Sequence, residues 1–232
     1  DRCKRTPQPS TGRGYVWAAQ NVLIAMADAT GQEIWGQGPR AGAPDKHQYA
    51  RTCGGVSYHE SNARECAKRI VTGPIDARMI AVDALSGEPC RSFGENGAVD
   101  LRKGLGPHLA NQYYITSPPT VAGDLLVVGG LVLDSQDLGL PSGVVRAYSA
   151  TTGDFAWAWD LGNPGVYTEP PEGEIYTPGT PNVWTVMSYD SELDLVFAPT
   201  GNANPDYYGG ARRDFDDEWS SALVALNAKT GE

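Results

Sequence analysis

The residues most able to do chemistry lie in two loops that follow or border apolar runs. Asp134 and Ser135 come directly after the run 125–133, and Asn202 and Asn204 lie in the turn-rich segment 199–210. Carboxylate and amide oxygens are the ligands that Ca²⁺ and Mg²⁺ prefer, and such sites are completed by water or by a bound cofactor. These residues indicate a hard-cation site, although Asp and Asn also form ordinary turns.

Two further side chains have open roles. His59, one of three histidines, lies in the segment Thr52-Cys-Gly-Gly-Val-Ser-Tyr-His-Glu60. A histidine there could exchange protons with a bound molecule or make one structural hydrogen bond in a loop. Trp184 could present its large aromatic face to a ligand or belong to the core.

The cysteines form an even set without a CxxC motif, so a zinc or thioredoxin-like site is disfavoured. A disulfide between Cys53 and Cys66 would close a short loop and requires an oxidising compartment. Four unrelated thiols are the alternative, because pairing cannot be deduced from sequence. The four residues are Cys3, Cys53, Cys66 and Cys90.

The composition of the 232 residues excludes some partners. Lys and Arg number 18 against 28 Asp and Glu, which gives a net charge of −10. Affinity for nucleic acid depends on neutralising phosphates, so we expect no nucleic-acid partner. No run approaches the roughly 20 apolar residues of a membrane span. The chain also lacks an initial Met or signal-like stretch, so we expect a soluble segment whose export signal or anchor was removed or lies outside it.

A repeated phrase must position these polar loops. It consists of a small polar turn that ends in glycine, follows an apolar β-type run, and in two copies precedes a tryptophan. Glycine supplies the positive φ of a tight hairpin, and a following tryptophan would anchor neighbouring units. The phrases end at Gly31, Gly87, Gly153 and Gly231. The predicted strands are 21–26, 78–82, 124–128, 143–148, 193–198 and 221–226.

Sheets of about four strands that repeat every 40–50 residues describe a β-propeller. The repeat glycines lie farther apart than that, so long loops must account for the difference. A binding site is expected on such loops, because a rigid repeat scaffold positions them. The candidate loops are 36–60, 99–117, 134–142, 162–183 and 200–219.

The repeated phrase resembles the tryptophan docking motif of quinoprotein alcohol dehydrogenases, which are all-β, eight-bladed propellers that carry pyrroloquinoline quinone (PQQ). Four segments look like the membrane-bound glucose dehydrogenase branch, which also includes quinate and polyol dehydrogenases. These segments are 52–60, 116–119, 142–146 and 205–210. The resemblance implies that residues 1–232 are part of a single PQQ-binding propeller domain. About four blades would be present, with the chain ending within a repeat.

The resemblance implies a metal site for Mg²⁺ or Ca²⁺ beside the quinone. Asp134 matches the acidic ligand, and Ser135 stands where glucose dehydrogenases have an Asn. Asn204 matches the third ligand position, and Asn202 is the competing choice for it.

The resemblance also implies contacts to PQQ itself. Trp184 matches the tryptophan that stacks on the quinone, and Thr116 and Asn182 match polar contacts to its carboxylates and ring. His59 matches a histidine near the quinone and the sugar pocket.

Two departures from the family pattern bear on catalysis. Where relatives read Cys-Arg-Gly, this chain has Cys53-Gly54-Gly55, so a guanidinium expected on a PQQ carboxylate is missing. Arg51 is a candidate substitute. The aspartate that serves as general base in the family, and its basic partner, are expected beyond residue 232.

The resemblance implies a periplasmic enzyme, tethered to the inner membrane in its full-length form. It would oxidise an aldose, a cyclic polyol or a hydroxy acid of glucose or quinate type, passing hydride to PQQ and electrons to ubiquinone through a membrane segment outside this chain. A soluble PQQ alcohol dehydrogenase is one alternative, disfavoured by the motif 57–60 and by the absence of adjacent cysteines. A cofactor-free scaffold for protein assembly is the other, and it has no reason to keep Asp134, Asn204, Thr116 and Trp184 together.

Overall fold

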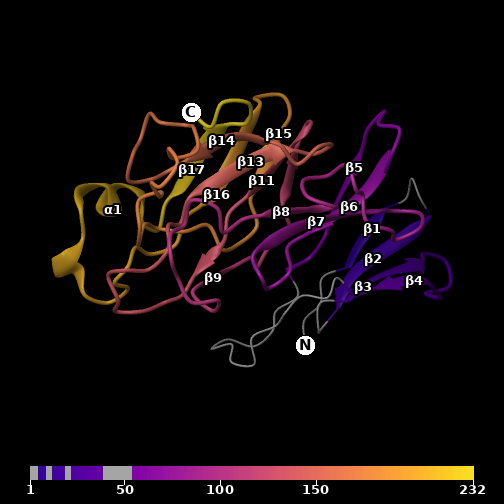
Figure 1. Ribbon diagram of the computed structural model, residues 1–232, viewed down its shortest axis with the longest axis horizontal. Helices are drawn as coiled ribbons and strands as arrows, with labels where there is room; N and C mark the ends of the chain where they lie inside the picture. The colour runs from indigo at the N-terminus through magenta and orange to yellow at the C-terminus, as the bar shows by residue number, and fades with distance from the viewer. Residues whose placement is uncertain (1–4, 9–11, 19–21, 39–53) are drawn as a thin grey trace.

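The computed structural model describes residues 5–8, 12–18, 22–38 and 54–232, and it is built almost entirely from β-strands (Figure 1). Four antiparallel sheets follow one another along the chain. The first contains β1 (Arg5–Gln8), β2 (Arg13–Ala18), β3 (Val22–Ala27) and β4 (Glu33–Gln37), in that order. The second contains β5 (Ser57–Glu60), β6 (Lys68–Thr72), β7 (Arg78–Asp83) and β8 (Ala98–Asp100), also in order.

The third and fourth sheets have the same up-and-down topology. The third contains β10 (Thr120–Ala122), β11 (Leu125–Val128), β13 (Val145–Ser149) and β14 (Phe155–Trp159). The fourth contains β15 (Ser188–Asp190), β16 (Leu195–Pro199) and β17 (Leu223–Asn227). A small sheet pairs β9 (Tyr113–Tyr114) with β12 (Leu131–Val132) beside the third. Successive meanders of this kind are the blades of a propeller, so the predicted fold class is confirmed.

Three of the predicted loops contain regular structure. The segment 99–117 contains β9. The segment 36–60 ends in β5, whose Tyr58 pairs with Ile70 of β6. The segment 200–219 contains a 3₁₀ turn (Gly209–Ala211) and the short helix α1 (Asp214–Trp219). Acidic residues in the first turn favour that helix, because they lie at the positive end of its dipole. Among the described residues, no helix has the length and apolar character needed to cross a membrane.

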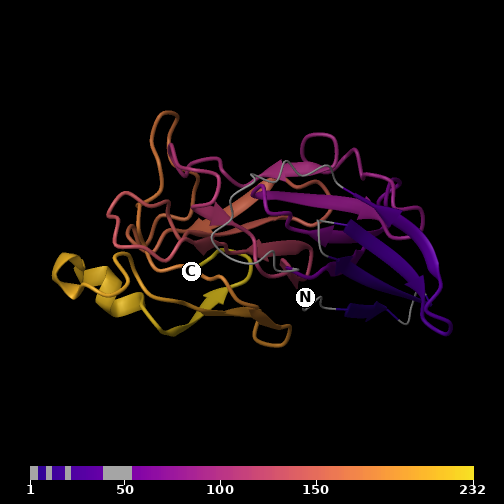
Figure 2. The same cartoon turned by 90° about the horizontal axis from the view of Figure 1, so that it is seen from below.

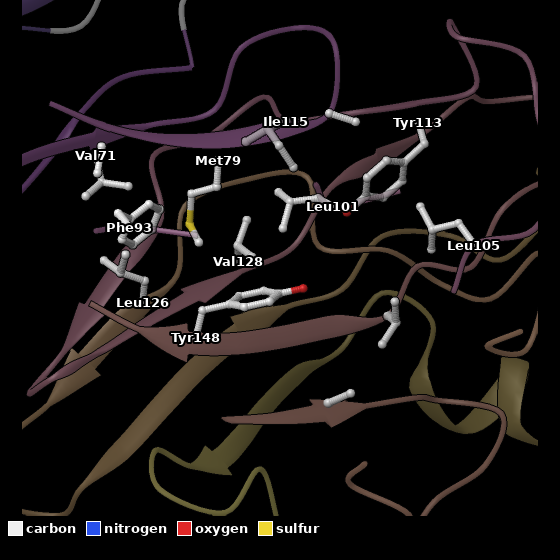
Figure 3. Packing of buried hydrophobic residues seen from close by; sticks show 14 of the residues in the cluster. Val71, Met79, Phe93, Leu101, Leu105, Tyr113, Ile115, Leu126, Val128 and Tyr148 are labelled. Carbon is white, nitrogen blue, oxygen red and sulfur yellow. The ribbon is translucent and has the colours of Figure 1, made fainter. Parts of the chain in front are cut away.

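The sheets pack face to face, and a separate core lies between each successive pair. The two views show the first sheet and α1 at opposite ends of this array (Figures 1 and 2). Between the second and third sheets, Val71 and Met79 face Leu126, Val128 and Tyr148 (Figure 3). The middle blades are therefore covered on both faces.

The alternation of side chains along a strand explains how one blade serves two cores. Ile70 belongs to the core shared with the first sheet, whereas its neighbour Val71 belongs to the core shared with the third. Likewise Leu126 faces the second sheet and Val127 the fourth. Successive strand residues point to opposite faces, so strands buried on both faces read as continuous apolar runs.

The repeated phrase forms the joint between blades. Trp35 of the first sheet donates its indole N–H to Ala84 O of the second, 3.3 Å away. Gly87 has a φ of 78°, and a Cβ there would lie 2.8 Å from the Trp35 ring. Only glycine meets both conditions without strain. The predicted role of the tryptophan as an anchor between neighbouring units is confirmed.

The joint between the third and fourth sheets repeats this arrangement. Trp157 donates its indole N–H to Ala228 O at 2.8 Å, and a Cβ on Gly231 would lie 2.6 Å from the Trp157 ring. The joint between the second and third sheets has no tryptophan. There the backbones approach directly, and Gly94 N donates to Thr152 O at 2.7 Å.

The disulfide of the second sheet differs from the expected one. Cys66 is bonded to Cys90, with their Cα atoms 5.7 Å apart, so of the alternatives left open, both the pairing of Cys66 with Cys53 and four unpaired thiols are wrong. Both cysteines are buried in the same core, and Cys90 N donates to Ala81 O of β7, which pairs with β6, the strand that follows Cys66. Cys3 and Cys53 lie outside the described residues.

Candidate functional site

A cavity of about 480 Å³ opens where loops of the third and fourth sheets meet. Asp134 enters it just after β12, Asn182 and Trp184 enter from the segment before β15, and Asn202 from the loop after β16. The structure thus brings together four residues that were singled out in the sequence. The complete lining is Leu131, Asp134, Asn182, Trp184, Gly201, Asn202, Asp206 and Tyr207.

Close backbone contacts hold the central segment of this cavity against the third sheet. A Cβ on Gly129 would lie 2.4 Å from Val183 O, and a Cβ on Gly143 would overlap Pro181 O. Gly143 N also donates to Thr180 Oγ1 at 2.8 Å. These two glycines allow an approach that any side chain would block, and they fix the position of the segment that carries Asn182 and Trp184.

Trp184 presents its indole to the cavity with half of its side chain exposed. Its carbonyl accepts hydrogen bonds from the hydroxyls of Thr116 and Ser117, the latter at 2.9 Å. Gly201 lies beside the indole edge, where an added Cβ would be 3.2 Å from Nε1. An aromatic ring fixed by its backbone and open on one side is suited to stack on a flat ligand.

Three side-chain oxygens near the cavity are buried without a hydrogen-bond partner in the described part of the chain: Asn182 Oδ1, Asn204 Oδ1 and Asp206 Oδ2. Asn182 and Asn204 are each 5% exposed. Their backbones are fixed, since Gly201 N donates to Asn182 O at 2.8 Å and Asn204 N donates to Gly179 O at 3.2 Å. Buried polar atoms are nearly always paired, so this group of oxygens indicates a ligand site.

The two carboxylates of the cavity are linked through the backbone. Asp206 N donates to Ser135 O at 3.1 Å, which joins the loop after β16 to the residue that follows Asp134. Burial, followed by the charge of Asp134, raises the pKa of Asp206 above its ordinary value. Burial and the same charge raise the pKa of Tyr114. The cavity is therefore a region of negative potential.

The two candidate asparagines differ in what their amide oxygens do. Asn202 is exposed, and its Oδ1 accepts a hydrogen bond from Ser221 Oγ at 3.0 Å. Asn204 is buried, and its Oδ1 has no partner among the described residues. Ser135 Oγ accepts from Asp137 N at 3.1 Å. Asn202 lines the cavity and Asn204 does not. Asn204 Oδ1 nevertheless has no partner among the described residues, while Asn202 Oδ1 and Ser135 Oγ take part in loop hydrogen bonds.

The donor set fits a hard cation, and the ring of Trp184 adds a face for a flat ligand. No cluster of three or more His, Cys, Asp or Glu side chains occurs in the part of the chain that the structure covers. The cavity instead combines carboxylates with amide oxygens, which is the mixture that Ca²⁺ and Mg²⁺ accept.

His59 lies away from this cavity. It is a buried residue of β5, and its Nε2 is 3.5 Å from Asp124 Oδ1, in the turn between β10 and β11. Asp124 precedes β11 and Asp134 follows β12, so at about 3.3 Å per residue they lie at opposite ends of the blade. Burial lowers the pKa of His59, while its hydrogen bond with Asp124 acts in the opposite direction. The structure does not bring His59 to the other candidate residues.

Gly54 lies beside Thr116, where an added Cβ would be 3.5 Å from the Thr116 carbonyl carbon. A larger residue at position 54 would therefore start next to the backbone of Thr116, whose hydroxyl donates to the Trp184 carbonyl. The candidate substitute Arg51 lies outside the described residues.

Sequence reasoning missed four parts of the cavity: Leu131, Gly201, Asp206 and Tyr207. The sequence position of Asp206 could have identified it, since it follows Asn204 by two residues in the same turn-rich segment. The position of Tyr207 is a weaker indication, and its side chain is 89% exposed at the cavity rim.

Comparison with known proteins assigns the fold to a family. The family model described as "PQQ: Glucose/ethanol/alcohol dehydrogenase, beta-propeller domain" matches residues 2–232. The chain is 41% identical to the glycerol dehydrogenase large subunit of Gluconobacter oxydans, with 94% of this chain and 30% of that protein covered. It is 32% identical to quinoprotein glucose dehydrogenase A of Acinetobacter calcoaceticus, with 98% and 30% covered.

A solved structure supports the fold. Quinohemoprotein alcohol dehydrogenase from Comamonas testosteroni superposes with a TM-score of 0.64 over 95% of this chain and 32% of that one, at 22% identity. The chain thus spans about a third of the length of the relatives it matches. On the match over nearly its whole length, this chain belongs to the PQQ-dependent glucose/ethanol/alcohol dehydrogenase family and forms part of its β-propeller domain.

Proposed function

We propose that this chain supplies one wall of the PQQ and cation site in a dehydrogenase that oxidises a polyol or an aldose. Residues 1–232 would be part of a single propeller domain. The observation that carries the proposal is the cavity itself, in which partnerless oxygens of Asn182 and Asp206, with that of Asn204 nearby, accompany the half-exposed ring of Trp184. Bound PQQ would supply the hydride acceptor, and Ca²⁺ or Mg²⁺ would polarise its reacting carbonyl.

The residues of the chain bind and orient in this proposal. Trp184 offers its ring face for stacking, and Thr116 keeps that ring in place through the Trp184 carbonyl. Asn182 directs a buried amide oxygen toward the ligand. Asp134 and Asn204 hold the cation, with Asn204 favoured over Asn202 because its oxygen has no other partner among the described residues.

The substrate class is inferred from relatives and from chemistry. The similar proteins named above carry the names of glycerol and glucose dehydrogenases. Both substrates are polyhydroxylated, and we infer the same class here. A periplasmic location agrees with the disulfide Cys66–Cys90, because disulfides persist in oxidising compartments. Transfer of electrons to ubiquinone at the inner membrane completes the proposal.

The test uses the intact protein that carries this chain, prepared without cofactor. PQQ and Ca²⁺ are added, and reduction of an artificial electron-accepting dye is followed with glycerol, glucose and quinate in turn. We expect PQQ-dependent reduction with at least one polyhydroxylated substrate, and the Trp184→Ala variant should need a much higher PQQ concentration for the same rate. Dye reduction that is independent of PQQ, or none with any sugar or polyol, would contradict the proposal and favour a scaffold.

A further inference from the structure

Asp206 is a carboxylate of the cavity for which no role was expected from the sequence. Its side chain lines the same cavity as Asp134, and its Oδ2 is buried with no hydrogen-bond partner in the described structure. An isolated buried carboxylate oxygen is costly unless it is paired or coordinates a metal. The unpaired Oδ2 of Asp206 costs stability, and a ligand bound in the cavity would offset that cost.

The position of Asp206 is fixed by its backbone. The hydrogen bond from Asp206 N to Ser135 O, at 3.1 Å, ties it to the residue that follows Asp134. Arg212 lies nearby, but its Nη2 reaches the main-chain oxygen of Asp206 at 3.4 Å and not the carboxylate. The Asp206 carboxylate also has a backbone hydrogen bond with Ser135 and interacts with the charge of Arg212, while Oδ2 has no hydrogen-bond partner in the described structure.

Asp134 and Asp206 repel each other in this cavity. The charge of Arg212 and a backbone hydrogen bond from Ser135 oppose this effect at Asp206 only in part, since its pKa stays raised, and a bound cation would offset the rest. Amide oxygens without partners lie in the same region, on Asn182 and on Asn204. Both asparagines are more than nine-tenths buried. Amide oxygens stabilise a bound cation, but they do not take up a proton. These oxygens therefore favour a cation over a proton as the group that offsets the repulsion.

We propose that Asp206 is a further carboxylate ligand of the cation that Asp134 and Asn204 hold. This inference rests on the proposed function and extends it by one residue. With two carboxylates, the site carries two negative charges and matches a divalent cation, whose affinity depends on the number of charged ligands.

The test measures Ca²⁺ binding and thermal stability in the intact protein, without PQQ and after treatment with a chelator. Asp206→Asn keeps the size and the backbone hydrogen bond. Without Ca²⁺ its melting temperature should equal or exceed that of the wild type, because a repulsion is removed. With Ca²⁺ its stabilisation should be much smaller, and the Kd from titration calorimetry should rise about tenfold or more.

Asp137→Asn is the matched control. Asp137 lies on the same loop as Asp134, is exposed, and does not line the cavity. Its substitution removes the same charge and should leave both the Kd and the Ca²⁺-induced shift near the wild-type values. An equal loss in both variants would mean that only the general negative potential matters, and it would overturn the role of Asp206 as a ligand.

A third variant separates this inference from the proposed function. If Asp134→Asn loses Ca²⁺ binding while Asp206→Asn retains it, Asp206 is not a ligand and the proposed function stands. If neither substitution changes Ca²⁺ binding, the cation site and the proposed function both fail. A lower melting temperature of Asp206→Asn both with and without Ca²⁺, at unchanged Kd, would assign Asp206 a structural role only.

Discussion

Two tryptophans show how the two ends of the blades differ. Trp157 is 2% exposed, and its indole N–H is bonded to Ala228 of the next blade. Trp184 is 50% exposed and is held by its backbone carbonyl, so that its ring remains open to a cavity. At the joint, the Trp157 side chain makes its hydrogen bond within the fold. At the cavity, the fold holds the Trp184 backbone carbonyl and leaves the side chain open.

The same contrast holds for polar atoms. In the turn of the fourth sheet, Asn227 Oδ1 accepts from Lys229 N and Thr230 N, and Gly231 N donates to Asn227 O. In the cavity, the Oδ1 atom of Asn182 has no partner among the described residues. This turn between blades thus has its Asn227 amide oxygen hydrogen-bonded, whereas the Asn182 amide oxygen at the cavity has no partner in the described structure.

The largest expected effect distinguishes the two tryptophans. Trp157→Ala removes a fully buried ring and its hydrogen bond, and should lower the free energy of unfolding by about 3–5 kcal/mol. Trp184→Ala should change it far less and should instead weaken PQQ binding by about 2 kcal/mol, roughly 30-fold in Kd. Urea unfolding and fluorescence titration with PQQ measure the two quantities. Equal losses of stability would remove the contrast between the ends.

A substitution of a partnerless oxygen should separate stability from binding. Asn182→Leu removes an amide whose Oδ1 has no partner, so without cofactor the variant should be as stable as the wild type or gain about 1 kcal/mol. PQQ binding should fall clearly. Thermal unfolding with and without PQQ shows both effects. A loss of several kcal/mol without cofactor would show that Asn182 serves the fold.

The hydroxyl that holds Trp184 offers a finer test. Thr116→Val keeps the shape but removes the hydrogen bond to the Trp184 carbonyl. Because Ser117 also donates to that carbonyl, at 2.9 Å, we expect a loss of about 1 kcal/mol, roughly fivefold in the Kd for PQQ. Ser117→Ala is the matched control and should act similarly. No change in the double variant would mean that other contacts position the ring.

The smallest effect concerns His59, at the end remote from the cavity. Burial lowers its pKa below the ordinary 6.5, so the unfolded chain binds protons more readily. Stability should therefore decrease as the pH falls through 6.5 and be fully restored above it. His59→Gln should reduce this dependence in urea unfolding at several pH values. The Kd for PQQ should not change, and a clear change would place His59 in the binding site after all.

The fold could be predicted because its signals are local. The strands of the runs 78–82 and 193–198 appear as β7 and β16, and the turns at Gly87 and Gly231 form as expected. Each turn needs only a few consecutive residues and a positive φ. The pairing of Cys66 with Cys90 could not be predicted, because it depends on which strands lie side by side.

The candidate site could be predicted in part from the sequence. Asp134, Asn182, Trp184 and Asn202 meet in one cavity, as the resemblance implied. His59 was misplaced because a strand carries residues to both of its ends, and the sequence does not state which end a side chain reaches. The roles of these residues toward PQQ and a cation stay predictions.

The joints between blades are asymmetric, since Trp157 of one sheet meets Gly231 of the next and the reverse contact does not occur between these sheets. Such contacts are head-to-tail, and a repeated head-to-tail contact either closes into a ring or continues as an open helix. The choice depends only on the rotation that each joint imposes. The number of blades in a complete ring therefore depends on every joint, on the backbone contact of Gly94 with Thr152 as much as on the tryptophan–glycine contacts.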